Sequence, residues 1–264
     1  MLSSPFAVLQ GATPHAIAHR GGAWEAPENS ERAFQHAITL GFSFLETDIR
    51  ATSDGVAVVF HDPSLDRTTD REGLIRELTW DTVSKARIHG REPILRLDEL
   101  LESFPDVRFN LDVKEPNAII PFVDTVRDSR AWDRICVGSF SHERLVRVRR
   151  LAGPRLATSL SPKEIINLRL RSLGLPVRWK PPKAACAQIP ISFGAHILAE
   201  SRFLAAAHEL GWQVHVWTVD QPDVMSQLLE LGVDGIMSDR PSTLKRVLDG
   251  LGLWPSFTPI DSAA

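Results

Sequence analysis

Five residues in the first quarter of this chain have the side chains that acid–base and cation chemistry needs. His19 and Arg20 follow a short apolar segment, Glu46 and Asp48 lie two positions apart in a second, and His61 ends a third. Histidine can take up or release a proton near neutral pH. Carboxylates at alternate positions of a strand share one face, where they can hold a hard cation. Brought together, these side chains suit cation-assisted attack on a phosphate ester.

The rest of the sequence predicts the frame that would bring them together. From residue 17 onward, short apolar segments alternate with helix-like ones, which is typical of a parallel sheet with crossover helices. Strands are predicted at residues 17–20, 44–50, 56–61, 108–114, 135–140, 155–160, 184–189, 213–219 and 235–238. Helices are predicted at residues 29–40, 98–103, 118–130, 142–151, 163–173, 199–210, 222–231 and 242–251, with Ser141 and Ser242 as N-caps of two of them. About eight such repeats close an α/β fold of the (β/α)8 TIM-barrel type, which gathers its strand ends at one mouth.

One predicted strand is surplus to an eight-stranded barrel. Residues 44–50 and 56–61 are separated by a short loop that contains a hairpin Asp-Gly dipeptide at Asp54. Because so short a loop cannot hold a crossover helix, we expect residues 56–61 to run antiparallel at the barrel mouth. Residues 63–96 are charged and weakly periodic, and we expect them to form a short insertion at the catalytic face. The whole chain, residues 1–264, is then a single barrel domain.

The composition is that of an ordinary soluble protein. The chain has 264 residues, of which 43% are hydrophobic and 24% charged, enough material for a large core. Its net charge of −3 and the lack of a long basic stripe argue against binding of nucleic acid. No apolar run could span a bilayer and the N-terminus lacks the pattern of a signal peptide, so we expect no stable membrane association. Cys136 and Cys186 lie in apolar segments, which favours reduced, buried thiols and a cytoplasmic location.

A set of short motifs occurs along the chain in a fixed order. It comprises His19-Arg20-Gly21, Pro27-Glu28-Asn29-Ser30, Glu46-Thr47-Asp48, Asp54-Gly55, His61-Asp62, Arg67-Thr68-Thr69, Phe109-Asn110-Leu111-Asp112-Val113-Lys114, Val216-Trp217-Thr218-Val219-Asp220 and Gly232-Val233-Asp234-Gly235-Ile236-Met237-Ser238-Asp239. Each motif alone is weak, but the ordered set, from about residue 17 to 248, resembles the glycerophosphodiester phosphodiesterase family of TIM-barrel enzymes. Two positions differ from the family pattern. Ser30 stands where Thr is usual, and either residue can cap a helix; Asp112 stands where Glu is commoner and has a shorter reach toward a cation.

The resemblance implies hydrolysis of small glycerophosphodiesters, such as glycerophosphocholine or glycerophosphoethanolamine, to glycerol 3-phosphate and an alcohol. It also implies that His19 and His61 are the catalytic pair. One histidine would deprotonate the attacking oxygen and the other would protonate the leaving alkoxide. The attacking oxygen can belong to water or to the 2-hydroxyl of the substrate, and either histidine can take either role.

The resemblance further implies a divalent metal cofactor. Glu46, Asp48 and Asp112 would be the metal ligands, an all-oxygen set that suits Mg²⁺ or Ca²⁺ better than zinc. Without the motif, the alternative for Glu46 and Asp48 is a set of salt bridges around the mouth. Two like charges so close together are costly unless a cation lies between them.

Four further residues are predicted to contact the substrate. Arg20, with its planar fork, and Lys114, as a point charge, would hold the non-bridging phosphate oxygens. Trp217 ends a strand where the family has a matching tryptophan, and Phe140 ends another. These two rings would form a wall against the substrate, with burial in the core as the alternative.

Two other functions compete with this prediction. A lipid-cleaving phospholipase of C or D type on a related barrel would need an apolar rim, and charges interrupt the residues that the insertion offers for one, namely Leu65, Leu74, Ile75, Leu78 and Trp80. A non-catalytic barrel that only binds would be expected to lack a histidine or a carboxylate of the set, and none is missing. We therefore predict a metal-dependent phosphodiesterase with a small-molecule substrate.

Overall fold

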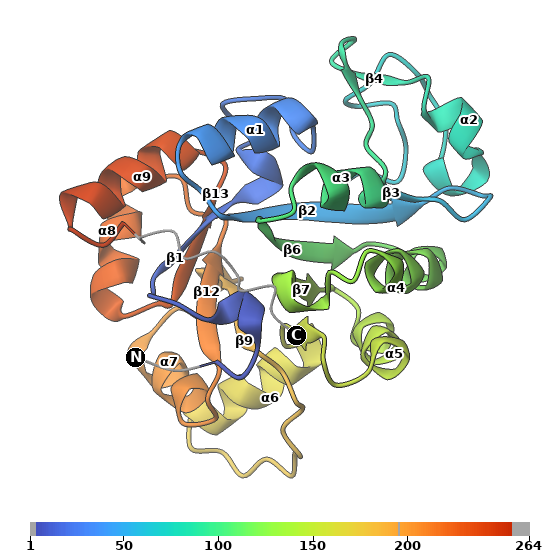
Figure 1. Cartoon of the computed structure of the whole chain (residues 1–264). Coiled ribbons are helices and arrows are strands. Elements are labelled where there is room, and N and C mark those ends of the chain that lie inside the picture. Colours follow the sequence, from blue (N-terminus) through green and yellow to red (C-terminus); the bar gives the residue numbers. More distant parts are fainter. Residues whose placement is uncertain (1–3, 195, 255–264) are drawn as a thin grey trace.

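The computed structural model describes residues 4–194 and 196–254, and within them a parallel sheet curls into a barrel (Figure 1). Eight parallel strands of these residues form its wall. Their order around the barrel is β8 (Ala157–Thr158), β7 (Ile135–Gly138), β6 (Arg108–Val113), β2 (Phe44–Ala51), β1 (His15–Ala18), β13 (Gly235–Ser238), β12 (Gln213–Trp217) and β9 (Cys186–Pro190). The first and last strands of the described residues, β1 and β13, are therefore neighbours.

The seam between β8 and β9 completes the barrel. Ser159 and Cys186 form an isolated parallel bridge at this seam. The N–H of Leu160 donates to the carbonyl of Cys186, and the N–H of Ala185 donates to the carbonyl of Thr158, both at 2.8 Å. These bonds make the barrel nearly closed, and the predicted TIM-barrel class is confirmed.

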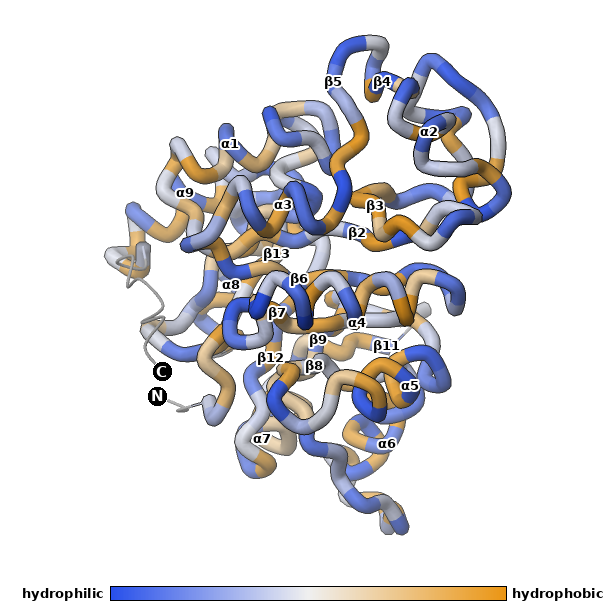
Figure 2. The backbone as a smooth tube through the Cα atoms, turned by 45° about the vertical axis from the view of Figure 1, so that its right-hand side comes forward, coloured by the Kyte–Doolittle hydropathy of each residue, from blue (hydrophilic) through white to orange (hydrophobic). Residues whose placement is uncertain are grey.

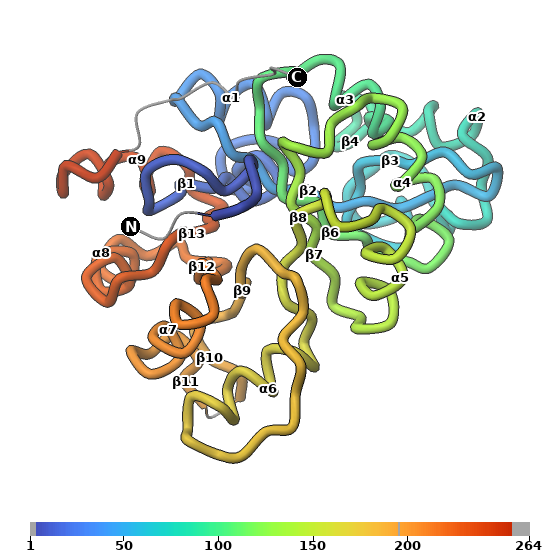
Figure 3. Tube along the Cα trace, turned by 60° about the horizontal axis from the view of Figure 1, so that its bottom comes forward, coloured from blue at the N-terminus to red at the C-terminus, as the bar shows by residue number. Residues whose placement is uncertain are grey.

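Helices surround the strands, as Figure 3 shows from another side. They are α1 (Glu31–Thr39), α3 (Leu97–Ser103), α4 (Ile119–Asp128), α5 (His142–Ala152), α6 (Pro162–Ser172), α7 (Ser201–His208), α8 (Pro222–Leu231) and α9 (Pro241–Gly250). Their bounds differ from the predicted ones by at most two residues at either end. Figure 2 shows that the hydrophobic segments concentrate in the strands and in the helix faces turned toward them, so the main core lies between the two layers.

The predicted N-cap of α9 is wrong. This helix begins at Pro241, which suits the first helical position because it has no N–H to satisfy, and Arg240 is the N-cap residue. Ser242 lies inside the first turn, and the carboxylate of Glu25 accepts bonds from its N–H at 3.0 Å and its hydroxyl at 2.6 Å. Ser141 does cap α5, because its hydroxyl accepts an N–H of the first turn at 3.2 Å.

The segment after β2 leaves the barrel, as predicted. Strand β3 (Ala57–Val59) pairs antiparallel with the end of β2. Residues 63–96 then form short elements beyond β3 in Figure 1: a 3-10 turn (Ile75–Glu77), α2 (Trp80–Val83), β4 (Arg87–Ile88) and β5 (Glu92–Pro93). Leu65 and Ile75 are fully buried in an apolar cluster of this segment. They cannot form the lipid-facing rim that the phospholipase alternative required of them.

The barrel interior changes from apolar to polar along the strands. At the amino ends, a 3-10 turn (Ala7–Leu9) places Leu9 against inward-facing side chains such as Ile17 and Phe44. Further along β2, the residues that share this inward face are Glu46 and Asp48. The amino end of the barrel is therefore closed by apolar packing, and the ionisable groups lie toward the mouth. Among residues 4–194 and 196–254, no helix is both long enough and apolar enough to cross a membrane.

The two cysteines lie inside the barrel. Both Cys136 and Cys186 are free and fully buried, with their sulfur atoms 3.8 Å apart. The expected burial of both cysteines is confirmed.

Candidate active site

A tight turn at the end of β1 positions the first two candidate residues. The 3-10 turn His19–Gly21 follows the strand directly, and Arg20 takes a left-handed conformation with φ of 51°. At Gly21, φ is 78°, and a Cβ would lie 2.8 Å from the Cβ of Ala33 on α1. Only glycine fits there. The glycine of the His-Arg-Gly motif therefore lets α1 approach closely and fixes the turn.

His19 lies between two carboxylates. Its Nδ1 is 2.7 Å from Oδ1 of Asp239, and its Nε2 is 3.6 Å from Oε2 of Glu46. Burial disfavours the charged imidazolium, but these neighbouring carboxylates outweigh burial and raise the pKa of His19. The Asp239 contact also fixes the ring orientation, so that Nε2 points to the side of Glu46.

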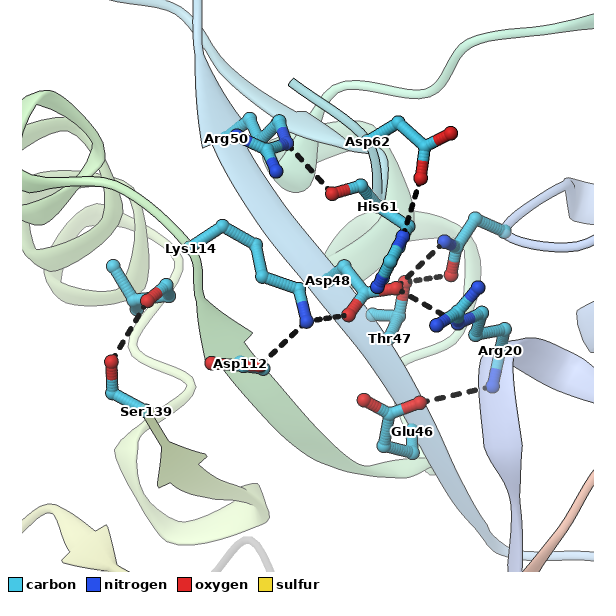
Figure 4. A network of polar contacts seen from close by, with 12 residues as sticks. Arg20, Glu46, Thr47, Asp48, Arg50, His61, Asp62, Asp112, Lys114 and Ser139 are labelled. Atoms are coloured by element: carbon cyan, nitrogen blue, oxygen red, sulfur yellow. Dashed lines mark hydrogen bonds and ion pairs between the residues drawn. The ribbon is translucent and has the colours of Figure 1, made fainter. Parts of the chain in front are cut away.

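His61 has an aspartate partner of its own. Its Nδ1 is 2.6 Å from Oδ1 of Asp62, and its carbonyl accepts a bond of 2.8 Å from Nε of Arg50 (Figure 4). Burial opposes ionisation of Asp62, but hydrogen bonds from Arg67 and His61 outweigh it and lower the pKa of Asp62 to about 2. Each candidate histidine is therefore backed by an ionised or ion-paired carboxylate, a pairing that orients the imidazole for proton transfer.

The register of β2 and β6 brings the acidic residues together. Asp48 lies opposite Asp112 in this parallel pair. Lys114 bridges them, with its Nζ 2.7 Å from Oδ1 of Asp48 and 2.6 Å from Oδ2 of Asp112 (Figure 4). Burial opposes charge on Asp48 and on Lys114, yet their opposite charges prevail: the pKa of Asp48 is lowered and that of Lys114 is raised. Lys114 thus holds Asp48 in its charged form and contacts Asp112 at the same time.

Among the residues that the structure describes, no lysine or arginine side chain forms an ion pair with Glu46, and its charged neighbour is His19 at 3.6 Å. The backbone N–H of Arg20 donates to Oε2 of Glu46 at 3.0 Å. Glu46 is only 5% exposed. Burial, with the nearby charge of Asp48, raises the pKa of Glu46 despite His19. Glu46 and Asp48 are buried close together, and a positive charge between two such carboxylates would stabilise their ionised forms.

The chemical nature of these oxygen donors suits a divalent cation. Oδ1 of Asp112 is a buried oxygen without a hydrogen-bond partner, and the oxygens of Glu46 and Asp48 are the hard ligands that such an ion prefers. In the described residues, no three acidic, histidine or cysteine side chains are arranged closely enough to hold an ion in this conformation. Lys114 occupies the position between Asp48 and Asp112. It would have to turn aside for both aspartates to share a metal.

The Pro-Glu-Asn-Ser motif supports the site from behind. Oε1 of Glu28 accepts a bond of 3.0 Å from Arg20. Asn29, buried and left-handed with φ of 56°, donates to Oδ2 of Asp48 at 2.9 Å and accepts from the hydroxyl of Thr47 at 2.6 Å. Ser30 caps α1. The motif therefore fixes Arg20 and Asp48 relative to one another.

A cavity of about 790 Å³ opens at the mouth of the barrel. All nine predicted site residues line it, namely His19, Arg20, Glu46, Asp48, His61, Asp112, Lys114, Phe140 and Trp217. The rings of Phe140 and Trp217 meet edge to face with their centroids 5.4 Å apart. Phe140 is 63% exposed, so it is not a core residue. The structure brings the predicted set together in one place.

Sequence reasoning did not assign a role to Asp239. Ala18 of β1 pairs with Ser238 of β13, so the residues that follow them, His19 and Asp239, lie next to each other. The signal is the pairing of the first and last strands, which the local sequence does not contain.

Comparison with known proteins places the chain in a group. A sequence profile of the Glycerophosphoryl diester phosphodiesterase family matches residues 19–243. The chain is 40% identical, over 90% of its length and 92% of the relative, to a Mycobacterium tuberculosis protein named "Probable glycerophosphodiester phosphodiesterase 2". It is 30% identical, over 86% and 95%, to a glycerophosphodiester phosphodiesterase of Caldanaerobacter subterraneus.

A solved structure agrees with these sequence matches. An Oleispira antarctica phosphodiesterase, solved in complex with the product sn-glycerol-3-phosphate, has a TM-score of 0.75 and 25% identity, covering 90% of this chain and 97% of that one. Barrel, cavity and relatives together define a phosphoric diester hydrolase. More particularly, the chain belongs to the glycerophosphoryl diester phosphodiesterase family.

Proposed function

We propose that this protein hydrolyses glycerophosphodiesters to glycerol 3-phosphate and an alcohol, with a divalent metal as cofactor and two histidines as acid and base. The observation that carries the proposal is the pairing of His19 with Asp239 and of His61 with Asp62 on one cavity. The product bound by the Oleispira relative supports the choice of substrate.

Proton transfer is assigned to His19 and His61. An alkoxide is a poor leaving group at neutral pH, so one histidine protonates it while the other removes a proton from the attacking oxygen. The aspartate behind each ring holds one nitrogen, which leaves the other free to face the substrate. The attacking oxygen is either water or the 2-hydroxyl of the glycerol.

Phosphate binding is assigned to Arg20 and Lys114. The guanidinium of Arg20 is already oriented by Glu28 and lies 3.3 Å from Oδ2 of Asp48. Lys114 supplies a second positive charge on the same cavity. Both cations would neutralise the non-bridging oxygens, whose charge grows as the attacking oxygen approaches. Trp217 and Phe140 would form the wall beside them.

Glu46, Asp48 and Asp112 would hold the cation, either Mg²⁺ or Ca²⁺. When bound, such an ion polarises the phosphoryl group. In the same state we expect Lys114 to turn from Asp48 toward the phosphate, since a cation would then balance the carboxylate charge. The unpartnered Oδ1 of Asp112 is the atom that supports a direct ligand role.

The test uses protein stripped of metal and then supplied with Mg²⁺ or Ca²⁺. We expect release of glycerol 3-phosphate from glycerophosphocholine or glycerophosphoethanolamine only after the ion is restored. His19→Ala and His61→Ala should each lower kcat by about 10²–10⁴. The variant that lacks the acid should recover in part on a diester with an aryl leaving group, because that group needs less protonation. Full activity without metal, or near-normal kcat in either variant, would contradict the proposal.

A further inference from the structure

Exposed hydrophobic side chains gather on one side of the molecule. Of the twelve large hydrophobic residues that are exposed in the described part of the chain, five lie on or next to α6 and on the hairpin of β10 (Ser192–Phe193) and β11 (His196–Ile197). In Figures 1 and 3, α6 and the chain that follows it run along the outer edge of the molecule. We call this surface the α6 face and define it by Ile166, Leu173, Leu175, Phe193 and Ile197.

These five side chains lie close together in the fold. Ile166, Leu173 and Phe193 line the same cavity. The N–H of Leu175 donates to the carbonyl of Leu170 at 3.1 Å, which holds Leu175 against the end of α6. The fifth side chain is on the strand that pairs with that of Phe193. An exposed apolar patch of this kind marks a surface that meets a protein or a membrane.

The charge of this region has one sign. Residues 165–199 contain five lysine and arginine residues and no aspartate or glutamate, although the whole chain has 33 acidic residues against 30 basic ones. Arg171 lies 3.7 Å from Glu209, and both of these side chains are well exposed. Because an exposed pair is weak and is screened by salt, Arg171 remains able to contact an anionic ligand.

The segment after α6 presents two further cations. Trp179 is half-buried and packs on Trp212, with the ring centroids 5.7 Å apart. Its neighbours on both sides, Arg178 and Lys180, are exposed. The tryptophan therefore anchors a segment whose cations face the solvent, a short distance along the chain from Leu175.

Basic and apolar side chains on one exposed surface fit an anionic lipid bilayer. Interfacial binding combines burial of hydrophobic side chains at the boundary of the acyl chains with attraction of lysine and arginine to anionic head groups. A second copy of this chain would bring positive charge against positive charge. A nucleic acid would match the charge but would leave the hydrophobic side chains exposed. Charge complementarity together with the apolar patch therefore favours a membrane surface.

We propose that the α6 face docks the protein reversibly on anionic lipid bilayers. The hydrophobic side chains enter the interface, while Arg171, Arg178 and Lys180 contact the anionic head groups. Such binding needs no spanning helix and is reversible, so it is compatible with the expected absence of stable membrane association. It does not depend on the proposed phosphodiesterase function. Because Ile166 and Phe193 also line the cavity, docking brings the entrance of the cavity to the bilayer surface.

Sedimentation of the full chain with lipid vesicles tests the docking. Vesicles of phosphatidylcholine and phosphatidylglycerol in equal amounts should carry the protein into the pellet. Vesicles of phosphatidylcholine alone should bind it roughly 100-fold more weakly, from ~1 kcal/mol for each of three cations near an anionic surface. At molar salt the Debye length is only about 3 Å, so the protein should be released from the mixed vesicles.

A matched pair of double variants locates the charges. Arg178→Glu combined with Lys180→Glu should weaken binding to the mixed vesicles by about 30-fold or more. Lys85→Glu combined with Arg127→Glu makes the same change in net charge at exposed cations of the insertion and of α4. This control should bind nearly as well as the wild type, because its substitutions lie away from the α6 face.

A second pair locates the hydrophobic contact. Ile197→Ser should weaken binding by about fivefold or more, as expected if the exposed part of this side chain is buried in the bilayer. Ile120→Ser makes the same change at an isoleucine of α4 that is 51% exposed, against 58% for Ile197, and it should leave binding unchanged. An unchanged Tm in each variant shows that it is folded.

Three outcomes would overturn the docking proposal: no pelleting of the wild type with the mixed vesicles, equal binding to phosphatidylcholine alone, or equal losses in the test and control variants. Binding to polyglutamate without binding to vesicles would also overturn it and would assign the α6 face to an acidic protein. Hydrolysis of glycerophosphocholine is measured separately without vesicles. Its absence would contradict the proposed phosphodiesterase function and leave the docking result unchanged.

Discussion

Replacing Asp239 by asparagine tests how the site sets the proton affinity of His19. The change keeps the size of the side chain and removes its charge. Asp239 contacts Nδ1 of His19 at 2.7 Å and is one of the two carboxylates that raise its pKa. We therefore expect the pKa of His19 to fall in Asp239→Asn, and the ring to lose its fixed orientation.

The size of the effect follows from the kind of bond that is lost. A hydrogen bond to a charged partner contributes about 1.5–3 kcal/mol. If the reaction uses this contribution fully in its transition state, kcat/KM falls about 10- to 150-fold. The loss should be smaller than that of His19→Ala, since the imidazole itself remains. Asp239 is a positioning residue, and it acts through the histidine.

The assay is the pH profile of kcat/KM on glycerophosphocholine with the divalent metal present. If His19 is the base, the acidic limb of the profile should move to lower pH; if it is the acid, the alkaline limb should move to lower pH. The limb that moves thus assigns the role. The matched control is Asp62→Asn, which removes the carboxylate beside His61 and should leave the His19 limb in place. A profile in Asp239→Asn that keeps both limbs at their wild-type positions would refute the reasoning.

Three further predictions concern metal binding and stability. Asp112→Asn should lose most of the divalent-ion affinity measured by calorimetry and Asp112→Glu should retain much of it; equal affinity in both would remove Asp112 from the ligand set. Gly21→Ala should lower Tm markedly, because its Cβ would lie 2.8 Å from Ala33, whereas Gly11→Ala, with a similar positive φ and open space, should lower it less; similar losses would show that backbone strain alone matters. Burial lowers the pKa of His15 from 6.5 to about 4. Between these pH values the unfolded chain binds a proton that the folded barrel does not. The free energy of unfolding should therefore decrease by about 3 kcal/mol in total as the pH is lowered through this range. Denaturation at a series of pH values should show this slope, and it should be shallower in His15→Gln; an unchanged slope would mean that other groups cause it.

Local patterns were enough to predict most of the site. In β2, the spacing of Glu46 and Asp48 predicted that both side chains share one face, and the parallel strands predicted that this face lies at the mouth. The hairpin signal at Asp54 gave the antiparallel β3. Such features depend on a few neighbouring residues and on the period of a strand, so they can be recognised without the fold.

Local sequence patterns did not predict the contacts between residues of distant strands. The partner of His19 comes from the other end of the chain, 220 positions away, and it depends on the register of β1 with β13. The position of Lys114 between two aspartates likewise depends on the register of β2 with β6. Register is set by the packing of the whole barrel, so no single segment specifies it.

The exposed apolar residues of α6 illustrate a different limit of sequence reasoning. In α6, Leu168 is fully buried in the core, while Ile166 and the C-cap residue Leu173 are exposed toward the cavity. Ile166 and Leu173 are seven positions apart and share one face of the helix, and Leu168 lies on the opposite face. The hydrophobic pattern records that both faces carry apolar residues but not what covers each of them. In the insertion, apolar residues that could equally have been exposed are buried instead, because Leu65 and Ile75 belong to a small core of that segment.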